Sequence, residues 1–502
     1  MPTVPTATRI LVIGGGPGGS TAATLLARQG YEVVLLERAY CPRYHIGESL
    51  LPSILQILNL LGARDKIEQF GFQLKRGAFF EWGPERWGLN FGELGGSCTY
   101  SFQVERAEFD QALLKHAESQ GVLVFEGVEV QALELQGDRP VRAAWIKRDR
   151  TPNADLTEND VVASGEISFD YLIDASGRNG LMATRYLHNR RFHKVFQNVA
   201  LWGYWKDARR GASGREGDIC CGSISNGWLW AIPLRDGKTS VGVVMHKSTF
   251  AQKRSASEAL DEIYADSIRE SPLIQSIVDP GTLTSTVRME QDYSYASERF
   301  CGPGYCMVGD AACFLDPLLS SGVHLATYSA LLAAASVGST FRQEVTADEA
   351  AVFYERSYRQ AYLRFLVFLS AFYDVGRTKE SYFWEAQRLT KVDVETGDLE
   401  MAFLNLVTGI KDMTDVQGSA HHLVLSTMAQ RINENLSLRK DKATLASLVG
   451  ERQDQANANA RFFTSVEGLF AFNEDEAVEG LFVAAEPRLR LARAGRPLMQ
   501  RR

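Results

Sequence analysis

The N-terminal residues combine short apolar runs with a glycine-rich turn. Residues 9–13 form an apolar run of the length typical of buried strands in parallel sheets. A helical pattern over 21–29 ends at Gly30, and a second apolar run covers 31–37. The order strand, tight turn, helix, strand predicts a βαβ unit whose two strands pair in parallel.

Further along the chain, apolar residues alternate with polar ones, and aromatic residues become frequent. This pattern over 76–102, 196–205 and 219–246 predicts antiparallel strands of a second layer. The remaining expected elements are buried strands at 169–174 and 306–309 and helices over 51–61, 107–119 and 322–337.

These elements predict an α/β fold. Residues 1–340 are expected to form a Rossmann domain interleaved with an antiparallel substrate-binding sheet, which covers about 72–105 and 190–300. Residues 341–502 are expected to form a helical C-terminal region over the substrate pocket.

The C-terminal region begins with a capping box, Thr346-Ala-Asp-Glu349, which predicts a long helix reaching Gly376. One face of this helix is aromatic and apolar, and we expect it to pack in the core. A substrate-binding role for the same face is the alternative. That face consists of Tyr354, Tyr358, Tyr362, Phe365, Leu369 and Phe372. Residues 487–502 carry six arginines and are expected to be a solvated tail, with docking of an acidic carrier protein as the alternative.

Composition and charge narrow the choice of partners and location. With 54 basic and 61 acidic residues the net charge is −7, which argues against a nucleic-acid partner. Residues 1–9 lack the features of a signal peptide, and the apolar run 365–372 is too short to span a membrane. We expect a cytoplasmic protein without a membrane association. The seven cysteines match no zinc spacing, so we expect reduced thiols and no metal.

The turn after the first strand, Gly14-Gly-Gly-Pro-Gly-Gly19, fits G-x-G-x-x-G and opens the first helix, which is the context that a dinucleotide site requires. Gly14 permits the tight turn, Gly16 lets the backbone approach a pyrophosphate, and Gly19 lets helix and strand pack closely. Glu37 closes the second strand, where a carboxylate accepts hydrogen bonds from ribose hydroxyls. This motif alone does not distinguish NAD from FAD.

Two later segments favour FAD. Tyr171-Leu-Ile-Asp-Ala-Ser-Gly177 and Met307-Val-Gly-Asp-Ala-Ala312 resemble the paired acidic motifs of p-hydroxybenzoate-hydroxylase-like flavoproteins. The resemblance covers residues 9–340. It implies that Asp310 meets the ribityl chain and that Arg106 contacts the flavin. The full set of expected FAD-binding residues is Gly14, Gly16, Pro17, Gly18, Gly19, Ser20, Glu37, Arg38, Arg43, Ile46, Gly47, Ser49, Arg106, Asp310, Gly322 and Val323.

Within that superfamily, three features resemble flavin-dependent halogenases. Gly227-Trp-Leu-Trp-Ala-Ile-Pro233 contains the W-x-W-x-I-P signature. The resemblance implies that Trp228, Trp230, Ile232 and Pro233 form a wall separating flavin from substrate, although the block also fits an aromatic sheet core. Asp316-Pro-Leu-Leu-Ser-Ser-Gly-Val-His-Leu-Ala326 resembles the loop that holds halide beside the flavin, with the N–H groups of Ser321 and Gly322 as its ligands.

The third feature is Lys75, which follows the flavin-binding segment and matches the family's essential lysine. In that family a flavin hydroperoxide oxidises halide to hypohalous acid, which the lysine positions beside the substrate ring. A charged Lys75 would act as a hydrogen-bond donor, and a neutral one would form a haloamine. At an ordinary pKa only about one lysine in 2,500 is neutral at pH 7, so the second route requires burial.

The substrate is expected to be a phenol. Tryptophan halogenases carry a glutamate at the position of Leu319, and its absence argues against free tryptophan. The phenolic branch includes halogenases of fungal aromatic polyketides and of carrier-bound tyrosyl units. His324, Tyr293 and Tyr295 are candidates for activating the phenol oxygen.

We therefore predict a secondary-metabolism oxidoreductase that uses FADH2, O2 and chloride or bromide to halogenate a phenolic ring, free or tethered to a carrier protein. A separate NAD(P)H:flavin reductase is expected to supply the reduced flavin. The first alternative is an aromatic hydroxylase of the same superfamily, and the second is a non-catalytic flavin-binding or carrier-docking relic.

Overall fold

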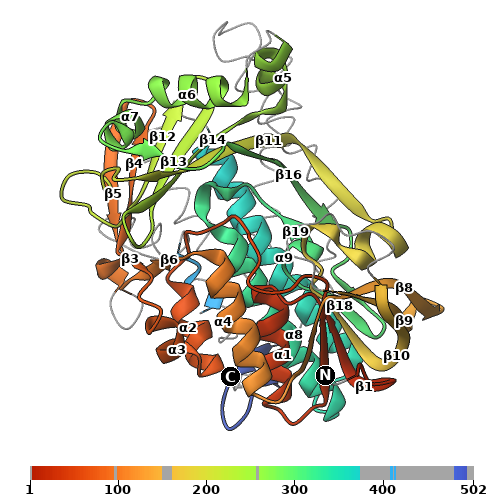
Figure 1. Cartoon of the computed structure of the whole chain (residues 1–502). Helices are drawn as coiled ribbons and strands as arrows, with labels where there is room; N and C mark the ends of the chain where they lie inside the picture. The colour runs from red at the N-terminus through yellow and green to blue at the C-terminus, as the bar shows by residue number, and fades with distance from the viewer. Residues whose placement is uncertain are drawn as a thin grey trace, which may run out of the picture.

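We analysed a computed structural model, which describes residues 3–94, 99–149, 161–255, 259–373, 408–410, 412–413 and 480–493. Across these ranges, no helix has the length and apolar character needed to cross a membrane. Two sheets, each covered by helices, make up most of the molecule (Figure 1).

The first sheet is built around parallel strands with the order β17-β18-β10-β1-β2-β7. The Gly14 turn links β1 (Ala7–Ile13) to helix α1 (Pro17–Ala27), and β2 (Val33–Glu37) pairs in parallel with β1. Helices α4 (Arg106–Ser119) and α8 (Ser321–Phe341) pack against α1 (Figure 1). The other members of this sheet are β7 (Leu123–Glu126), β8 (Val128–Gln136), β9 (Arg139–Arg148), β10 (Val161–Asp174), β17 (Cys301–Gly302) and β18 (Tyr305–Met307).

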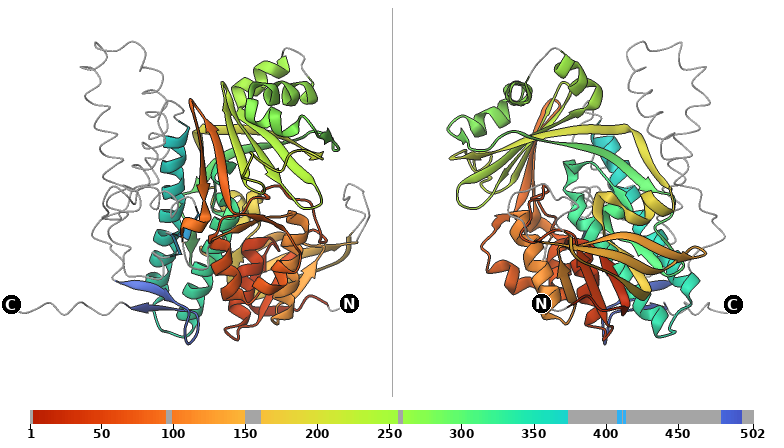
Figure 2. Two further views of the ribbon diagram at one scale, coloured as in Figure 1. Left: turned by 90° about the vertical axis from the view of Figure 1, so that its left-hand side faces the viewer. Right: turned by 45° about the vertical axis from the view of Figure 1, so that its right-hand side comes forward.

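The second sheet is mainly antiparallel, with the order β19-β16-β11-β14-β13-β12-β4-β5. One side of it packs on the rest of the core, and the other is covered by α6 (Leu260–Glu270) and α7 (Pro272–Val278), as Figure 2 shows. Its strands are β4 (Gly77–Trp82), β5 (Glu85–Asn90), β11 (Arg190–Lys206), β12 (Ile219–Ile224), β13 (Gly227–Pro233), β14 (Lys238–His246), β15 (Thr282–Leu283), β16 (Arg288–Ser297) and β19 (Cys313–Phe314).

A short two-stranded ribbon lies outside both sheets. Strand β3 (Gln73–Lys75) pairs with β6 (Ser101–Gln103) in a separate two-stranded ribbon. Helices α2 (Ser53–Leu61) and α3 (Arg64–Glu68) precede this ribbon, and α5 (Lys247–Ser255) follows β14.

Helix α9 (Ala347–Phe372) opens at the expected capping box, since Glu349 N–H donates to Thr346 Oγ1 over 3.2 Å and Thr346 N–H donates to the Glu349 carboxylate over 2.9 Å. Its aromatic face is buried in the core, as predicted. Tyr354 and Tyr358 donate their hydroxyls to the carbonyls of Met307 and Gly309, so they fix the strand end that leads into the site.

The fold class is confirmed as α/β with parallel and antiparallel strands. The chain also contains a C-terminal hairpin, β20 (Leu481–Ala484) and β21 (Arg490–Arg493), that the sequence did not indicate. Arg488 and Arg493 of this hairpin pair with Glu344 and Glu349 beside α9. These two arginines of the predicted solvated tail are therefore used within the chain, whereas residues 494–502 lie outside the described residues.

Candidate functional site

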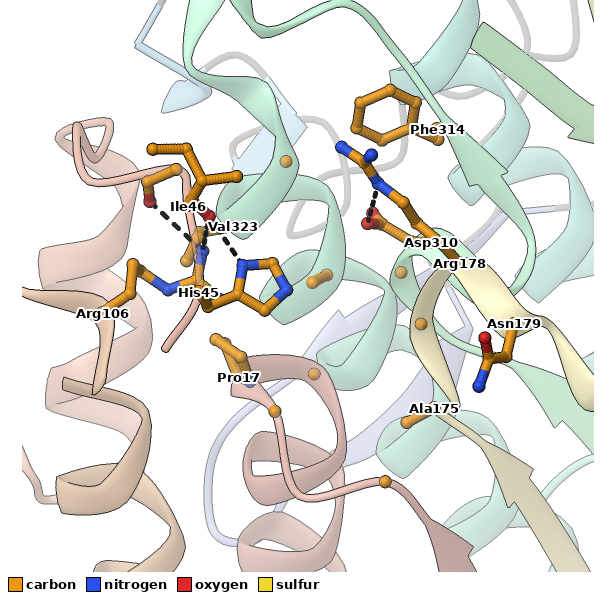
Figure 3. A pocket seen from close by; sticks show the side chains of 18 of the residues that line it. Pro17, His45, Ile46, Arg106, Ala175, Arg178, Asn179, Asp310, Phe314 and Val323 are labelled. Carbon is orange, nitrogen blue, oxygen red and sulfur yellow. Dashed lines mark hydrogen bonds and ion pairs between the residues drawn. The ribbon is translucent and has the colours of Figure 1, made fainter. Parts of the chain in front are cut away.

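A cavity of about 950 Å³ lies where the carboxyl ends of β1, β2 and β10 face the second sheet. This volume is close to the upper end of the ~300–1,000 Å³ range of ligand pockets. The predicted site residues that line it are Gly14, Gly16, Pro17, Gly18, Glu37, Arg38, Arg43, Ile46, Gly47, Ser49, Arg106, Trp228, Trp230, Ile232, Asp310, Gly322 and Val323. Figure 3 shows side chains that line this cavity, with Pro17 at the start of α1 and Asp310 and Val323 around the same space.

The glycine turn is held by close backbone contacts. Gly14 has a φ of +106°, and a Cβ there would lie 2.2 Å from the Ala175 carbonyl oxygen. A Cβ on Gly19 would lie 1.9 Å from the Gly14 oxygen, so helix and turn pack closely there. Gly19 and Ser20 are both buried and do not line the cavity. Gly16 differs, because its Cβ would meet only the Arg43 guanidinium, 3.5 Å away. The amino end of α1 therefore opens on the cavity at Gly16.

Glu37 organises this turn as well as lining the cavity. Its Oε2 accepts the Gly15 N–H over 2.6 Å, and its Oε1 accepts the Ala39 N–H over 2.9 Å. The Arg43 guanidinium lies 3.7 Å from Glu37 and 3.7 Å from Asp110, both of which are buried. The carboxylate thus holds the glycine turn and an arginine on the same wall.

Arg106 fixes the loop between β2 and α2. Its guanidinium forms two hydrogen bonds of 2.8 and 3.0 Å with buried Asp110. The remaining nitrogen donates to the carbonyls of Ile46 and Gly47 over 3.0 and 3.2 Å (Figure 3). Because a planar guanidinium makes several bonds at once, Arg106 sets the position of the loop that forms one side of the cavity.

Asp310 lies on the opposite side, in the short 3₁₀ turn after β18. Arg178 is 3.9 Å from its carboxylate and stacks on the Phe314 ring at 4.1 Å (Figure 3). Burial raises the pKa of Asp310, and Arg178 opposes that rise. A carboxylate of this kind needs a polar partner in the cavity, as hydroxyl groups of a ligand provide.

The tryptophan block forms the wall toward the second sheet. The rings of Trp228 and Trp230 are 5.9 Å apart on one side of β13, and both line the cavity. Trp230 Nε1 donates to Ser240 Oγ over 3.3 Å, and Trp228 Nε1 donates to the Tyr373 hydroxyl over 2.9 Å. Pro233 ends the strand opposite Thr239 and does not line the cavity.

Lys75 is buried beside the cavity without lining it. Its side chain is 2% exposed, whereas that of the adjacent Arg76 faces solvent. Lys75 Nζ donates to the Leu50 carbonyl over 3.1 Å and lies 5.5 Å from the centre of the Phe91 ring. Burial lowers the pKa of this ammonium group to about 8, so about one lysine in ten is neutral at pH 7.

The predicted halide loop forms the start of α8. Ser320 has a left-handed conformation, and α8 begins at Ser321. No atom lies within 4 Å of a Cβ built on Gly322, which is the one of the two predicted halide ligands that lines the cavity. Ser321 is buried, and its hydroxyl has no hydrogen-bond partner within the part of the chain that the structure describes.

Two of the candidates for phenol activation, Tyr295 and His324, do not line the cavity and make hydrogen bonds to other parts of the chain. Tyr295 donates its hydroxyl to the Asp310 carbonyl over 2.6 Å, so it supports the turn behind the cavity. His324 points away from the cavity into a buried polar cluster: its Nδ1 is 2.8 Å from Ser53 Oγ, and its Nε2 is 2.9 Å from Asp412 Oδ2. Tyr293 lies near Lys247 and does not line the cavity.

The Asp412 carboxylate makes hydrogen bonds to two members of this cluster, His324 and Arg364. The side chains of Arg364 and Asp412 are both almost fully buried. Burial tends to raise the pKa of Asp412, but Arg364 and His324 together lower it, so the group is charged. The cluster ties the segment at 408–413 to the starts of α2 and α8.

Replacing Asp412 with alanine should destabilise the protein by about 3–5 kcal/mol, because the Arg364 charge would keep its burial but lose its carboxylate partner. Chemical denaturation followed by circular dichroism measures the effect. Asp138→Ala, at an exposed turn, is the control and should change stability by no more than about 0.5 kcal/mol. Similar stability of both variants would contradict a structural role for the cluster.

Several residues that line the cavity were not predicted from the sequence. Val128, Glu129, Val130 and Arg185 form part of the cavity at the end of the parallel sheet, and no motif marks them. Arg178 follows the Tyr171–Gly177 motif directly, so that motif was the available signal. Glu48 lies between the predicted residues Gly47 and Ser49 and also lines the cavity.

The donor set of the cavity fits FAD. Guanidinium groups bind the oxygens of a diphosphate well, and the cavity is lined by Arg38, Arg43, Arg106, Arg178 and Arg185. The open space at Gly16 and Gly322 admits a ligand against the backbone at two helix starts. The carboxylates of Glu37 and Asp310 offer acceptors for ligand hydroxyls on opposite walls.

Comparison with known proteins agrees with this assignment. The family described as Tryptophan halogenase matches residues 9–99 and 94–404. The chain is 45% identical over 511 residues to "Tryptophan 2-halogenase" of Chondromyces crocatus, covering 98% of this chain and 95% of that protein. It is 36% identical to "Sulochrin halogenase gedL" of Aspergillus terreus (74% of this chain and 70% of that one). The solved structure of the myxobacterial chondrochloren halogenase CndH superposes with a TM-score of 0.67 at 37% identity, over 82% of this chain and 92% of that chain.

Proposed function

Because the chain belongs to the tryptophan halogenase family of flavin-dependent halogenases, we propose that it halogenates an electron-rich aromatic ring with FADH2, O2 and chloride or bromide. The observation that carries the proposal is the burial of Lys75 beside the cavity whose walls include Gly16, Gly322 and the two tryptophans. The alternative of a non-catalytic relic is disfavoured, because these groups are all present.

FAD would be held by the glycine turn, the arginines and the two carboxylates described above. When bound and reduced, it supplies with O2 the oxidising power that converts halide to hypohalous acid. Ser321 and Gly322 would hold halide at the start of α8, where unpaired N–H groups face an anion. Trp228 and Trp230 would keep the organic substrate off the flavin.

Lys75 would bind hypohalous acid and direct it to the ring. At pH 7 about nine lysines in ten are charged, given a pKa of about 8. The Leu50 carbonyl accepts one of the three ammonium N–H groups, which leaves two for hypohalous acid. We therefore assign the role to the ammonium form. The haloamine route requires the minority neutral form.

A phenol is the proposed substrate class. Leu319 supports it, because a leucine supplies no carboxylate to assist halogenation of an unactivated ring position. The names of two relatives, a tryptophan 2-halogenase and a sulochrin halogenase, give tryptophan and sulochrin as the substrates of those proteins. A phenol oxygen donates electrons to its own ring, so it needs less help from the protein than the benzene ring of indole. A separate flavin reductase would deliver FADH2, and the phenol would be presented free or tethered to a carrier protein.

The test offers the purified protein FADH2 from a flavin reductase, O2 and either halide, with phenols and tryptophan both free and carrier-linked. We expect a halogenated phenol, identified by its isotope pattern in mass spectrometry and dependent on added halide. Halogenated tryptophan alone would move the substrate class to indoles. A hydroxylated ring formed without halide would establish the hydroxylase instead.

A further inference from the structure

Glu48 is a buried carboxylate in the cavity wall that the proposed roles above do not use. Its side chain is 3% exposed and comes from the loop that Arg106 holds. One oxygen, Oε1, accepts the Tyr204 hydroxyl over 2.7 Å. The other, Oε2, is also buried and makes no close hydrogen bond to any residue that the structure describes, while the Ser240 hydroxyl interacts with the same carboxyl group. Glu48 is one of the residues that line the cavity, and a buried carboxyl oxygen without a close partner calls for a functional explanation.

From Glu48 a line of hydroxyl groups leads to the surface. The Tyr204 hydroxyl is 3.0 Å from the Tyr44 hydroxyl, and Tyr44, which also lines the cavity, is 45% exposed. Trp202 Nε1, which is only a donor, donates a hydrogen bond to the Tyr44 oxygen over 2.7 Å. Since Tyr204 donates to Glu48, the proton between the two tyrosines comes from Tyr44. The hydrogen bonds thus run in one direction, from the exposed tyrosine to the buried carboxyl group.

We infer that Tyr44, Tyr204 and Glu48 form a proton relay that delivers a proton from solvent to the cofactor cavity during halide oxidation. The inference rests on the proposed function. Halogenation consumes FADH2, O2, one halide ion, one proton and one aromatic C–H, and yields FAD, the aryl halide and two waters. The O–O bond of O2 breaks, the flavin is oxidised, and the halide replaces the ring hydrogen. Protonated Glu48 gives its proton to the cavity and regains one through Tyr204 and Tyr44.

The surroundings of Glu48 move its titration toward neutral pH, so that near pH 6 the protonated and ionised forms are both present. Burial raises the pKa of Glu48 to about 6, and the hydroxyls of Tyr204 and Ser240 partly oppose that rise. Burial also raises the pKa of Tyr204, so the phenols pass protons as neutral hydroxyls. The charged groups facing the relay are Lys238 beside the Tyr204 ring, Arg288 over the Tyr44 ring, and Glu105 and Arg106 near the Glu48 loop.

The first measurement does not depend on turnover. In flavin-free protein with ¹³C-labelled glutamate carboxyl groups, one signal should titrate near pH 6 and disappear in Glu48→Gln. Because Glu48→Gln keeps the shape of the side chain, thermal unfolding should show that this variant stays folded. A Glu48 signal that titrates at an ordinary glutamate pKa of about 4.3 would overturn the inference.

The second measurement is the pH profile of halogenated product, normalised to bound FAD. In the wild type the rate should fall as pH rises through about 6, because the donor form of Glu48 is lost. Glu48→Gln and Tyr204→Phe should lower the rate at pH 6 by about 10²-fold and flatten this part of the profile. Glu48→Asp should restore the pH dependence in part. Tyr31→Phe, which removes a hydroxyl bonded to the Gly338 carbonyl away from the cavity, should leave it unchanged.

The outcomes separate the two proposals. Product from the wild type with an unchanged profile in Glu48→Gln would overturn the relay and leave the halogenase standing. No halide-dependent product from the wild type at any pH would overturn the halogenase and the relay's role with it.

Discussion

Lys75→Ala should lower the rate of halogenated product by at least about 10³-fold while FADH2 and O2 are still consumed. Lys75 does not line the cavity proposed for FAD, so its loss should leave flavin binding intact, whereas hypohalous acid would lose its donor beside the ring. Product is measured by mass spectrometry, and oxygen uptake is followed in parallel. Uncoupled oxygen uptake with hydrogen peroxide or free hypohalous acid in solution is the expected signature.

Two further observations bear on Lys75. Lys75→Arg should also be poor, because a planar guanidinium does not fit a site in which the lysine is 2% exposed. In the wild type the ammonium form is present below a pKa of about 8 and is lost above it, so the rate should fall again as pH rises through that value. A rate that increases there would favour the haloamine route. Lys75→Ala with normal regioselective product would remove the lysine from the mechanism.

Gly16→Val should remove FAD binding and leave the protein folded. The Cβ would meet only the end of the flexible Arg43 side chain, 3.5 Å away, so the fold tolerates it. The same side chain would fill space that a pyrophosphate needs, and we expect at least about a 100-fold rise in Kd, or ~2.7 kcal/mol. Titration of FAD followed by flavin fluorescence measures this.

Gly19→Val is the matched comparison. Its Cβ would lie 1.9 Å from the Gly14 carbonyl oxygen, so this variant should lose stability as well as FAD binding. Circular dichroism on both variants separates the two causes. FAD affinity in Gly16→Val equal to that of the wild type would place the phosphate site elsewhere.

The first βαβ unit could be predicted from the sequence because its signals are local. Strand β1, the turn and β2 lie close to where the apolar runs put them, although α1 begins at Pro17, earlier than the apolar pattern indicates. Proline at the first helical position explains this, since its missing N–H costs nothing there. The capping box at Thr346 and Glu349 was equally local.

The parts that could not be predicted depend on contacts between distant residues. The sequence suggested His324 as a base, but its partners Ser53 and Asp412 lie far away along the chain, and together they bury the imidazole. The relay from Tyr44 to Glu48 needs Tyr204 from β11, which no motif links to that loop. Only the second half of strand β10, at 169–174, was predicted from the sequence. Its first half pairs with β9, and that pairing has no motif in the sequence.

The cavity is assembled from stretches of chain that are far apart in the sequence, including 13–18, 36–49, 128–130, 175–185 and 308–326. A ligand that touches all of them binds the folded chain and not the unfolded one. By thermodynamic linkage, FAD at 100 times its Kd adds about 2.7 kcal/mol to the free energy of unfolding. If FAD binds there as proposed, the melting temperature of this protein would rise with the concentration of FAD.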